Sequence, residues 1–247
     1  MTDCKDFFEV AKRHLAWVKE TQKDQIVKAA SLLGECMQND GIVQLVGFGN
    51  DGEFSMELGY RAGGLMPFHR CDIKDLCLRG LITEEQYNDP TTIEKEEYAP
   101  KFWETYKIDP RDMFIITCTD ASEGLCVEIA KKAKEEGHKV IAVISKKAAD
   151  AATSRHSSGK KTTDFADLVL DEGADYPDTN VEVAPGIKMC QVGTIAGNVI
   201  AQMLTGEAYR YFVEKGEDCP ILFSANIAGA DVHNRAISDK YLGRWNS

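Results

Sequence analysis

The segment Ser154-Arg155-His156-Ser157-Ser158-Gly159-Lys160-Lys161 is the most unusual stretch of the chain, because a histidine, hydroxyl groups and cations are crowded together in it. An imidazole titrates near neutral pH, so His156 could move a proton on or off a sugar oxygen. Ser157 and Ser158 could bind the same ligand through their hydroxyls. A histidine in a loop is often simply solvated, and both interpretations of His156 stay open.

A glycine-rich segment also has the spacing of a known binding motif. Gly47-Phe48-Gly49-Asn50-Asp51-Gly52 reads G-x-G-x-x-G after an apolar run, and Asp72 follows Gly52 by 20 residues. This pattern fits a dinucleotide-binding turn with an acid for the ribose hydroxyls. Glycines also occur in tight strand-to-helix turns for steric reasons alone, and that interpretation is favoured here.

Two further segments carry polar groups where ligands often bind. Cys118-Thr119-Asp120-Ala121-Ser122 precedes a helical stretch, so it could bind an anion or a hydroxyl group at a helix N-terminus. Asp120 or Ser122 could equally be the N-cap of that helix. Near the end of the chain, Asp231 and His233 are too few for a metal site, and Asp231 is interpreted as the N-cap of the last helix.

The elements that position these residues are indicated by apolar runs. Strands are predicted at 42–46, 65–71, 113–117, 140–144, 168–170 and 221–223, and helices at 53–61, 123–136, 192–213 and the C-terminus. Two N-terminal helices are predicted on either side of a polar break at Thr21–Asp24. Residues 73–100 are polar and irregular, with a helix plus a loop expected there, and residues 145–163 are expected to form a loop. Strands that are apolar throughout and alternate with helices predict a parallel sheet with ligands at its carboxyl end.

Length and composition limit the class of protein. We expect one α/β domain over residues 1–247, with residues 1–39 as a helical segment packed on it. There is no apolar run of about 20 residues and no secretory pattern at the N-terminus, which favours the cytoplasm. The net charge of −11 argues against nucleic acid and anionic membranes as partners. The eight cysteines lack CxxC spacing, so we expect buried, reduced thiols and no zinc site.

Three segments resemble the SIS (sugar isomerase) domain family, and in particular its branch of phosphosugar and phosphoheptose isomerases. They are Tyr60–Leu65, the segment Ser154–Lys161, and Ser224-Ala225-Asn226 with the later His233-Asn234. The resemblance covers essentially the whole chain, and the middle segment is the most specific. It implies a flavodoxin-like, three-layer αβα sandwich with a mainly parallel five-stranded sheet. It also implies a homodimer with sites near the interface, a sugar or sugar-phosphate ligand, and no cofactor.

The resemblance also suggests roles for individual residues. Glu57 matches a glutamate that takes a proton from carbon, and His156 matches a histidine that helps to open the sugar ring. An exposed ion pair between Glu57 and Arg61, four residues later, is the alternative for Glu57. The substrate-binding residues implied by the loops are Gly47, Gly49, Asn50, Asp51, Cys118, Thr119, Asp120, Ser122, Ser157, Ser158, Thr194 and Asn226.

The chain departs from the family pattern in the loops that usually hold phosphate. Asp51 and Asp120 stand where hydroxyls are usual, and Gly193 stands where a serine is common. A carboxylate at about 4 Å from a phosphate charge costs about 4 kcal/mol at an effective dielectric constant of 20. Unless Arg155, Lys160 and Lys161 compensate, the sequence favours an unphosphorylated or amino-bearing polyol.

The sequence thus predicts a sugar isomerase that works by enediol proton transfer between aldose and ketose. Two alternatives stay open. One is a sugar sensor without catalysis, which the altered loops would suit. The other is an NAD-dependent oxidoreductase, which rests on the glycine-rich segment and Asp72.

Overall fold

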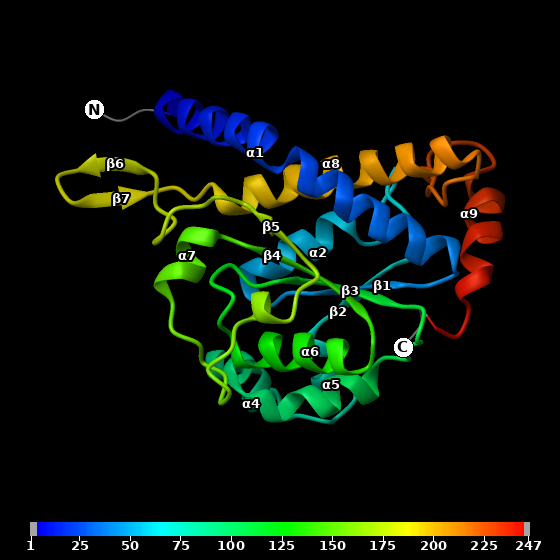
Figure 1. Ribbon diagram of the computed structural model, residues 1–247, viewed down its shortest axis with the longest axis horizontal. Helices are drawn as coiled ribbons and strands as arrows, with labels where there is room; N and C mark the ends of the chain where they lie inside the picture. Colours follow the sequence, from blue (N-terminus) through cyan, green and yellow to red (C-terminus); the bar gives the residue numbers. More distant parts are fainter. Residues whose placement is uncertain (1–3, 245–247) are drawn as a thin grey trace.

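The centre of the molecule is a sheet of five parallel strands (Figure 1). The computed structural model describes residues 4–244, and within this range the strand order is β2-β1-β3-β4-β5. The strands are β1 (Val43–Val46), β2 (Phe68–Cys71), β3 (Met113–Thr117), β4 (Lys139–Ile144) and β5 (Leu168–Asp171). All of β3 is buried, and so is β4 apart from Lys139, as strands covered on both faces require.

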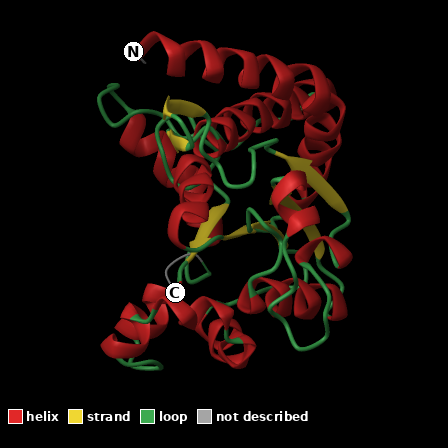
Figure 2. Ribbon diagram, turned by 90° about the vertical axis from the view of Figure 1, so that its left-hand side faces the viewer, coloured by secondary structure: helices red, strands yellow, loops and turns green. Residues whose placement is uncertain are grey.

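Helices cover both faces of this sheet. On one face lie α1 (Cys4–Gln38), α2 (Gly52–Leu58) and α8 (Gly193–Lys215), and on the other lie α3 (Ile73–Leu78), α4 (Glu84–Asn88), α5 (Ala99–Thr105) and α6 (Gly124–Glu135). The view turned by 90° shows the strands between helices above and below them (Figure 2). The prediction of a three-layer αβα sandwich with a parallel five-stranded sheet is confirmed.

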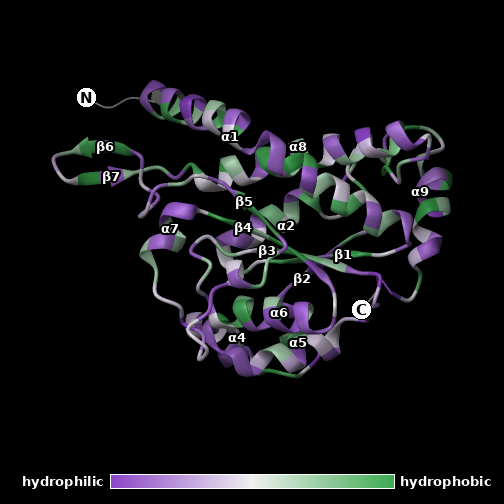
Figure 3. Ribbon diagram, in the orientation of Figure 1, coloured by the Kyte–Doolittle hydropathy of each residue, from purple (hydrophilic) through white to green (hydrophobic). Residues whose placement is uncertain are grey.

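Two apolar clusters fill the space on either side of the sheet. Because successive residues of a strand point to opposite faces, Met113 and Ile115 of β3 join the cluster under α1 and α8, whereas Phe114 and Ile116 join the one above α5 and α6. Hydrophobic residues are concentrated along the strands and on parts of the helices, and hydrophilic residues dominate the outer surfaces (Figure 3). None of the helices within residues 4–244 combines the length and apolarity of a membrane span.

The remaining elements lie at the edges of the sandwich. They are α7 (Lys146–Ala151), the hairpin of β6 (Val181–Ala184) and β7 (Ile187–Met189), α9 (Ala230–Ser238), and the 3-10 turns η1 (Gly49–Asp51), η2 (Pro90–Glu94), η3 (Glu96–Tyr98), η4 (Thr162–Asp164) and η5 (Asp239–Tyr241). The hairpin was not predicted. Helix α7 lies in the segment expected to be a loop, where the Ser145 hydroxyl accepts a hydrogen bond from the Ala148 N–H at 3.2 Å and caps the helix.

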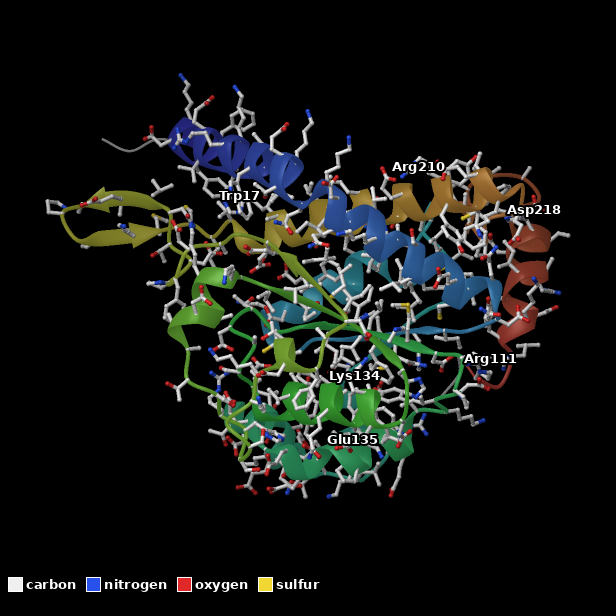
Figure 4. The ribbon with its side chains drawn as sticks, in the orientation of Figure 1. Trp17, Arg111, Lys134, Glu135, Arg210 and Asp218 are labelled. Carbon is white, nitrogen blue, oxygen red and sulfur yellow. The ribbon has the colours of Figure 1, made fainter. Side chains whose placement is uncertain are left out.

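The prediction of two N-terminal helices is wrong, because α1 is continuous. Its polar residues do not break it: the Thr21 hydroxyl donates to the Trp17 carbonyl at 2.8 Å, and Gln22 is buried. The Gln22 side-chain oxygen accepts a hydrogen bond from the Asp171 N–H at 3.0 Å, so the polar position anchors α1 to the end of β5. Figure 4 shows Trp17 on the side of α1 that faces the segment after β5.

Two predictions near the C-terminus are also wrong. Residues 221–223 do not form a strand of the sheet, because only an isolated antiparallel bridge joins Ile221 to Leu65. The backbone of Phe223 is instead held by the Asn234 side chain at 2.8 and 2.9 Å. Helix α9 has Gly229 as its N-cap, and Asp231 lies in its first turn.

The cysteines agree in part with the expectation of buried thiols. In the described part of the chain, seven cysteines are free; Cys36, Cys71, Cys118 and Cys126 are buried, and Cys77, Cys190 and Cys219 are half-buried. The side chain of Cys4 lies outside the described residues.

Candidate ligand-binding site

A cavity of about 340 Å³ lies at the carboxyl end of the sheet. Its walls come from the segments that follow β1, β3 and β5 and from the first turns of α8. This is the edge at which ligands of parallel α/β sheets bind. Five carboxylic acids line the cavity: Asp51, Glu53, Glu123, Glu172 and Asp178.

Asp51 reaches the cavity from the turn after β1. The turn is tight, since a Cβ on Gly47 would lie 2.6 Å from the Asp51 carbonyl oxygen. Asp51 accepts hydrogen bonds from the Thr119 N–H at 2.7 Å and the Thr119 hydroxyl at 2.6 Å. Burial raises the pKa of Asp51, and these two bonds from Thr119 oppose that effect.

Glu172 directly follows β5 and is only 5% exposed. Its carboxyl lies 3.4 Å from the same Thr119 hydroxyl that bonds Asp51, so the two carboxyl groups meet over one threonine. Burial raises the pKa of Glu172 to about 8, and repulsion from Asp51 and Asp178 adds to the effect. Near neutral pH this group therefore exists in both protonation states.

Glu123, the N-cap residue of α6, is a second buried carboxyl group with a raised pKa. Burial and then repulsion from Asp51 raise the pKa of Glu123 to about 8. The prediction that Asp120 or Ser122 caps this helix is wrong. Asp120 instead accepts hydrogen bonds from the Ser122 N–H at 2.9 Å and its hydroxyl at 2.8 Å, which forms a turn before the helix.

Asp178 occupies the N-terminus of α8. It accepts hydrogen bonds from the Val192 N–H at 3.2 Å and the Gly193 N–H at 2.8 Å. A Cβ on Gly193 would lie 2.9 Å from the Asp178 Oδ2 and 3.1 Å from the Glu172 Oε1. This crowding explains why glycine stands at this position: the two carboxyl groups leave no room for a side chain.

Thr117 contributes a polar group without a partner. Its side chain lines the cavity and is 4% exposed, and its hydroxyl has no hydrogen-bond partner within the described residues. Buried hydroxyls are nearly always hydrogen-bonded, so this one indicates a place for a polar group of a ligand or for water.

The structure brings together some of the predicted site residues and separates others. The cavity is lined by Gly49, Asn50, Asp51, Thr119 and Thr194. The other predicted site residues, which are absent from its lining, are Gly47, Glu57, Cys118, Asp120, Ser122, His156, Ser157, Ser158 and Asn226. Asp72, the proposed ribose ligand, accepts a hydrogen bond from the Lys74 N–H at 3.0 Å and caps α3.

The segment 154–161 is fastened to α6 and to the turn that precedes this helix. His156 is 6% exposed, and its Nε2 lies 2.7 Å from a Glu128 carboxyl oxygen and 2.9 Å from one of Glu96. The Ser158 N–H donates to the Nδ1 of His156 at 3.1 Å, so Nε2 carries the proton that faces the carboxylates. His156 is thus fully hydrogen-bonded and stands outside the cavity lining.

The cations of this segment are engaged as well. Arg155 pairs with Glu94 at 2.5 Å and Asp120 at 2.7 Å. Lys160 lies 3.5 Å from Asp164, and the Lys161 ammonium donates to the carbonyl of Ala149. None of the three lines the cavity, so they do not offset its carboxylates.

Glu57 lies on the outer side of α2. It pairs with Arg61 and accepts a hydrogen bond from the Gln202 side chain at 2.6 Å. Together with residues of α8 it borders a shallow surface groove. These contacts agree with the alternative interpretation of Glu57 as the partner of Arg61 in an ion pair.

Two groups of side chains have ligand atoms close enough together to hold a metal ion. In the described part of the chain, Cys118, Glu123 and Cys126 form one group and Glu96, Glu128 and His156 the other, with atoms within 4.8 Å of one another. Both are internally hydrogen-bonded: the Cys126 thiol donates to Glu123 at 3.5 Å, and His156 bonds Glu128 at 2.7 Å.

Four acids of the cavity were not predicted from the sequence: Glu53, Glu123, Glu172 and Asp178. Glu172 lies two residues after a predicted strand, and Glu53 and Glu123 begin predicted helices, so the rule that ligands bind after strands could have found them. No local signal places Asp178, which lies in the long segment between β5 and α8.

Comparisons with known proteins agree with this architecture. A family model described as the SIS domain matches residues 6–145. The UPF0309 protein GK1441 of Geobacillus kaustophilus is 32% identical over 96% of this chain and 94% of its own length. The UPF0309 protein BH3325 of Halalkalibacterium halodurans is 31% identical over 97% of this chain and 98% of its own length.

Solved structures support the same fold. A phosphoheptose isomerase from Francisella tularensis superposes with a TM-score of 0.56 at 15% identity, covering 85% of this chain and 100% of the other. A phosphoheptose isomerase from Neisseria gonorrhoeae superposes with a TM-score of 0.50 at 15% identity, covering 83% and 94% of the two chains. At this identity the likeness concerns the fold.

Proposed function

The chain belongs to the SIS domain family, and from that premise we propose that it binds a small sugar-like polyol in the cavity at the carboxyl end of its sheet and interconverts aldose and ketose forms. The observation that carries this proposal is the set of five carboxyl groups around a space of about 340 Å³. Carboxyl groups accept hydrogen bonds from sugar hydroxyls, and the volume suits a small ligand.

The chemistry proposed is proton transfer through an enediol. A base removes the hydrogen from the carbon next to the carbonyl group, a proton moves between the two oxygens, and the base returns a proton to the neighbouring carbon. Such a base works best when its pKa lies near the working pH. Burial raises the pKa of both Glu123 and Glu172 to about 8, so we propose these two groups for the proton transfers.

The roles predicted for Glu57 and His156 stay predictions. Neither lines the cavity within one chain, and both are held by hydrogen bonds to other side chains. Likewise the glycine-rich segment serves as the turn that presents Asp51, and Asp72 caps α3, which leaves little to support a dinucleotide site.

Assembly as a homodimer is a further part of this proposal. On the outer side of α8, Ile195, Val199 and Met203 border the shallow groove that also contains Glu57. The exposed Met56 of α2 adds to the apolar side chains on this side of the molecule. Light scattering of the purified chain would test this, and a monomer at micromolar concentration would contradict it. The cytoplasmic location likewise stays a prediction.

Hydrogen exchange in deuterated water tests the isomerase directly. An enediol route replaces the hydrogen at carbon 2 of the sugar by deuterium, which NMR detects even when the equilibrium hardly moves. We expect exchange with at least one aldose–ketose pair, and a loss of about 100-fold or more in Glu172→Gln. Binding of sugars with no exchange and no interconversion would instead establish the sensor alternative.

A further inference from the structure

Resting on the proposed function, we propose that the cavity recognises a cationic ligand: a sugar or polyol that bears an ammonium group and no phosphate. The charge of the lining points to this class. Of the described residues that line the cavity, five are carboxylic acids, whereas lysine, arginine and histidine are absent from the lining. An ammonium group gives three N–H donors to such acceptors.

The places where an anion would bind are filled by the protein's own carboxyl groups. The N–H groups at the start of α8 donate to Asp178, and the N–H and hydroxyl of Thr119 donate to Asp51. Glu123 stands at the N-terminus of α6, where a helix also favours an anion, and its side chain makes no capping hydrogen bond there. A phosphate in the cavity would find the donors of Thr119 and of α8 occupied and carboxyl groups around it.

The cations that could have compensated are held elsewhere. Arg155 is paired with Asp120 and Glu94. The Lys160 ammonium lies 3.5 Å from Asp164, and the Lys161 ammonium donates to the carbonyl of Ala149. No cation of the described lining therefore offsets the carboxyl groups of the cavity, which favours a ligand that brings positive charge.

The unpartnered hydroxyl of Thr117 is a second, independent indication of a polar ligand. Thr117 lines the cavity and is 4% exposed, and its buried hydroxyl lacks a partner within residues 4–244. A ligand that combines an ammonium group with hydroxyls would satisfy both the carboxyl oxygens and this threonine, whereas an apolar amine would leave Thr117 unpaired.

Binding of a cation should expel protons. Glu123 and Glu172 are partly protonated near neutral pH, because burial raises the pKa of each to about 8, and a bound ammonium group favours their ionised forms. The affinity for an ammonium ligand should therefore rise between pH 6 and pH 8. The other charged groups around these two glutamates are Asp51, Glu53 and Asp178 in the cavity, Asp171 beside Glu172, and Asp120, Glu94 and Arg155 beside Glu123.

Calorimetric titration of the full-length protein tests the proposal with a matched pair of ligands. Sorbitol and 1-amino-1-deoxysorbitol differ at one position, where an aliphatic ammonium group replaces a hydroxyl. Glucose, glucosamine and glucosamine 6-phosphate form a second series. We expect the amine of each unphosphorylated pair to bind about tenfold or more tightly than the neutral compound. Titrations near pH 7 in two buffers of different ionisation heat should show proton release.

Substitutions of the cavity acids test whether these acids cause the preference for the amine over the neutral compound. Glu172→Gln and Glu123→Gln should each reduce the preference for the amine and the proton release. Glu20→Gln removes one carboxyl from the exposed surface of α1 and should change neither. If Glu172→Gln fails to fold, Glu123→Gln and the proton release of the unaltered protein still decide the matter.

The outcomes separate this inference from the function on which it rests. Equal affinity for amine and neutral polyol, or tighter binding of the phosphate ester, would overturn the cationic ligand and leave a sugar-binding protein. Failure of every compound in both series to bind at millimolar concentration would overturn the proposed function together with this inference.

Discussion

Replacing Glu172 by glutamine should change how the stability of the protein depends on pH. Glutamine has nearly the shape of a protonated glutamate and can keep the contact with the Thr119 hydroxyl, which lies 3.4 Å from Glu172 in the structure. It cannot ionise. The substitution thus removes one titration from the folded state while keeping the packing of a side chain that is 5% exposed.

The size of this change in stability follows from the pKa values of Glu172 in the unfolded and the folded protein. In the unfolded chain Glu172 ionises with its ordinary pKa of about 4.5, and in the folded protein burial raises its pKa to about 8. Because the folded value is the higher one, the stabilising contribution is fully present below the unfolded pKa and is lost as pH rises toward the folded one. One pKa unit corresponds to about 1.4 kcal/mol, so at most about 4 kcal/mol is lost between pH 5 and pH 8.

Urea unfolding at several pH values between 5 and 9 would measure this contribution in both proteins. We expect the stability of the unaltered protein, relative to Glu172→Gln, to fall steadily with pH and to level off above about pH 8. The exposed Glu20→Gln variant should run parallel to the unaltered protein. A difference between the two proteins that stays constant across this range would show that Glu172 ionises normally and would refute the argument.

Three further predictions concern the cavity, the segment 154–161 and the packing of α1. Gly193→Ser should lower stability by about 1–3 kcal/mol in urea unfolding, because its Cβ would lie 2.9 Å from a carboxyl oxygen, whereas Gly206→Ser in the same helix, where the Cβ meets nothing within 4 Å, should not. His156→Ala should lower the melting temperature by leaving two carboxylates and a serine without their partner, a loss of about 1–3 kcal/mol, and an unchanged melting curve would contradict the role of His156 as a fastening residue. Gln22→Leu should remove the acceptor of the Asp171 N–H, cost about 1–2 kcal/mol and speed hydrogen exchange of that amide; unchanged exchange would show that this bond does not hold α1 to β5.

The sheet could be predicted from the sequence because its strands are buried on both faces. The runs at residues 113–117 and 140–144 are apolar apart from Thr117, and the structure has strands at Met113–Thr117 and Lys139–Ile144. The break predicted at Thr21–Asp24 is wrong for a different reason. The polar side chain of Gln22 makes a long-range hydrogen bond to Asp171, and periodicity cannot distinguish such a residue from one at a helix end.

The site was only partly predictable for a related reason. Asp51 and Thr119 lie in the segments that follow β1 and β3, and the structure places both in the lining of the cavity. The reactive-looking segment around His156 drew attention by its density of functional groups, yet those groups bond to one another and to neighbouring acids. Density of polar residues alone does not separate a ligand site from an internal network, because that depends on partners far away in the sequence.

The attachment of α1 to the segment after β5 has a consequence for how the cavity forms during folding. The His14 ring bonds the carbonyl oxygen of Glu172 at 2.7 Å across 158 positions of sequence, and Gln22 bonds Asp171 across 149. Contacts of such separation form only after a large loss of chain entropy. The wall that carries Glu172 therefore depends on the docking of the N-terminal helix onto the sheet. Because α1 also covers one apolar face of the sheet, a chain whose first helix is detached should lose both this wall and the cover of that face.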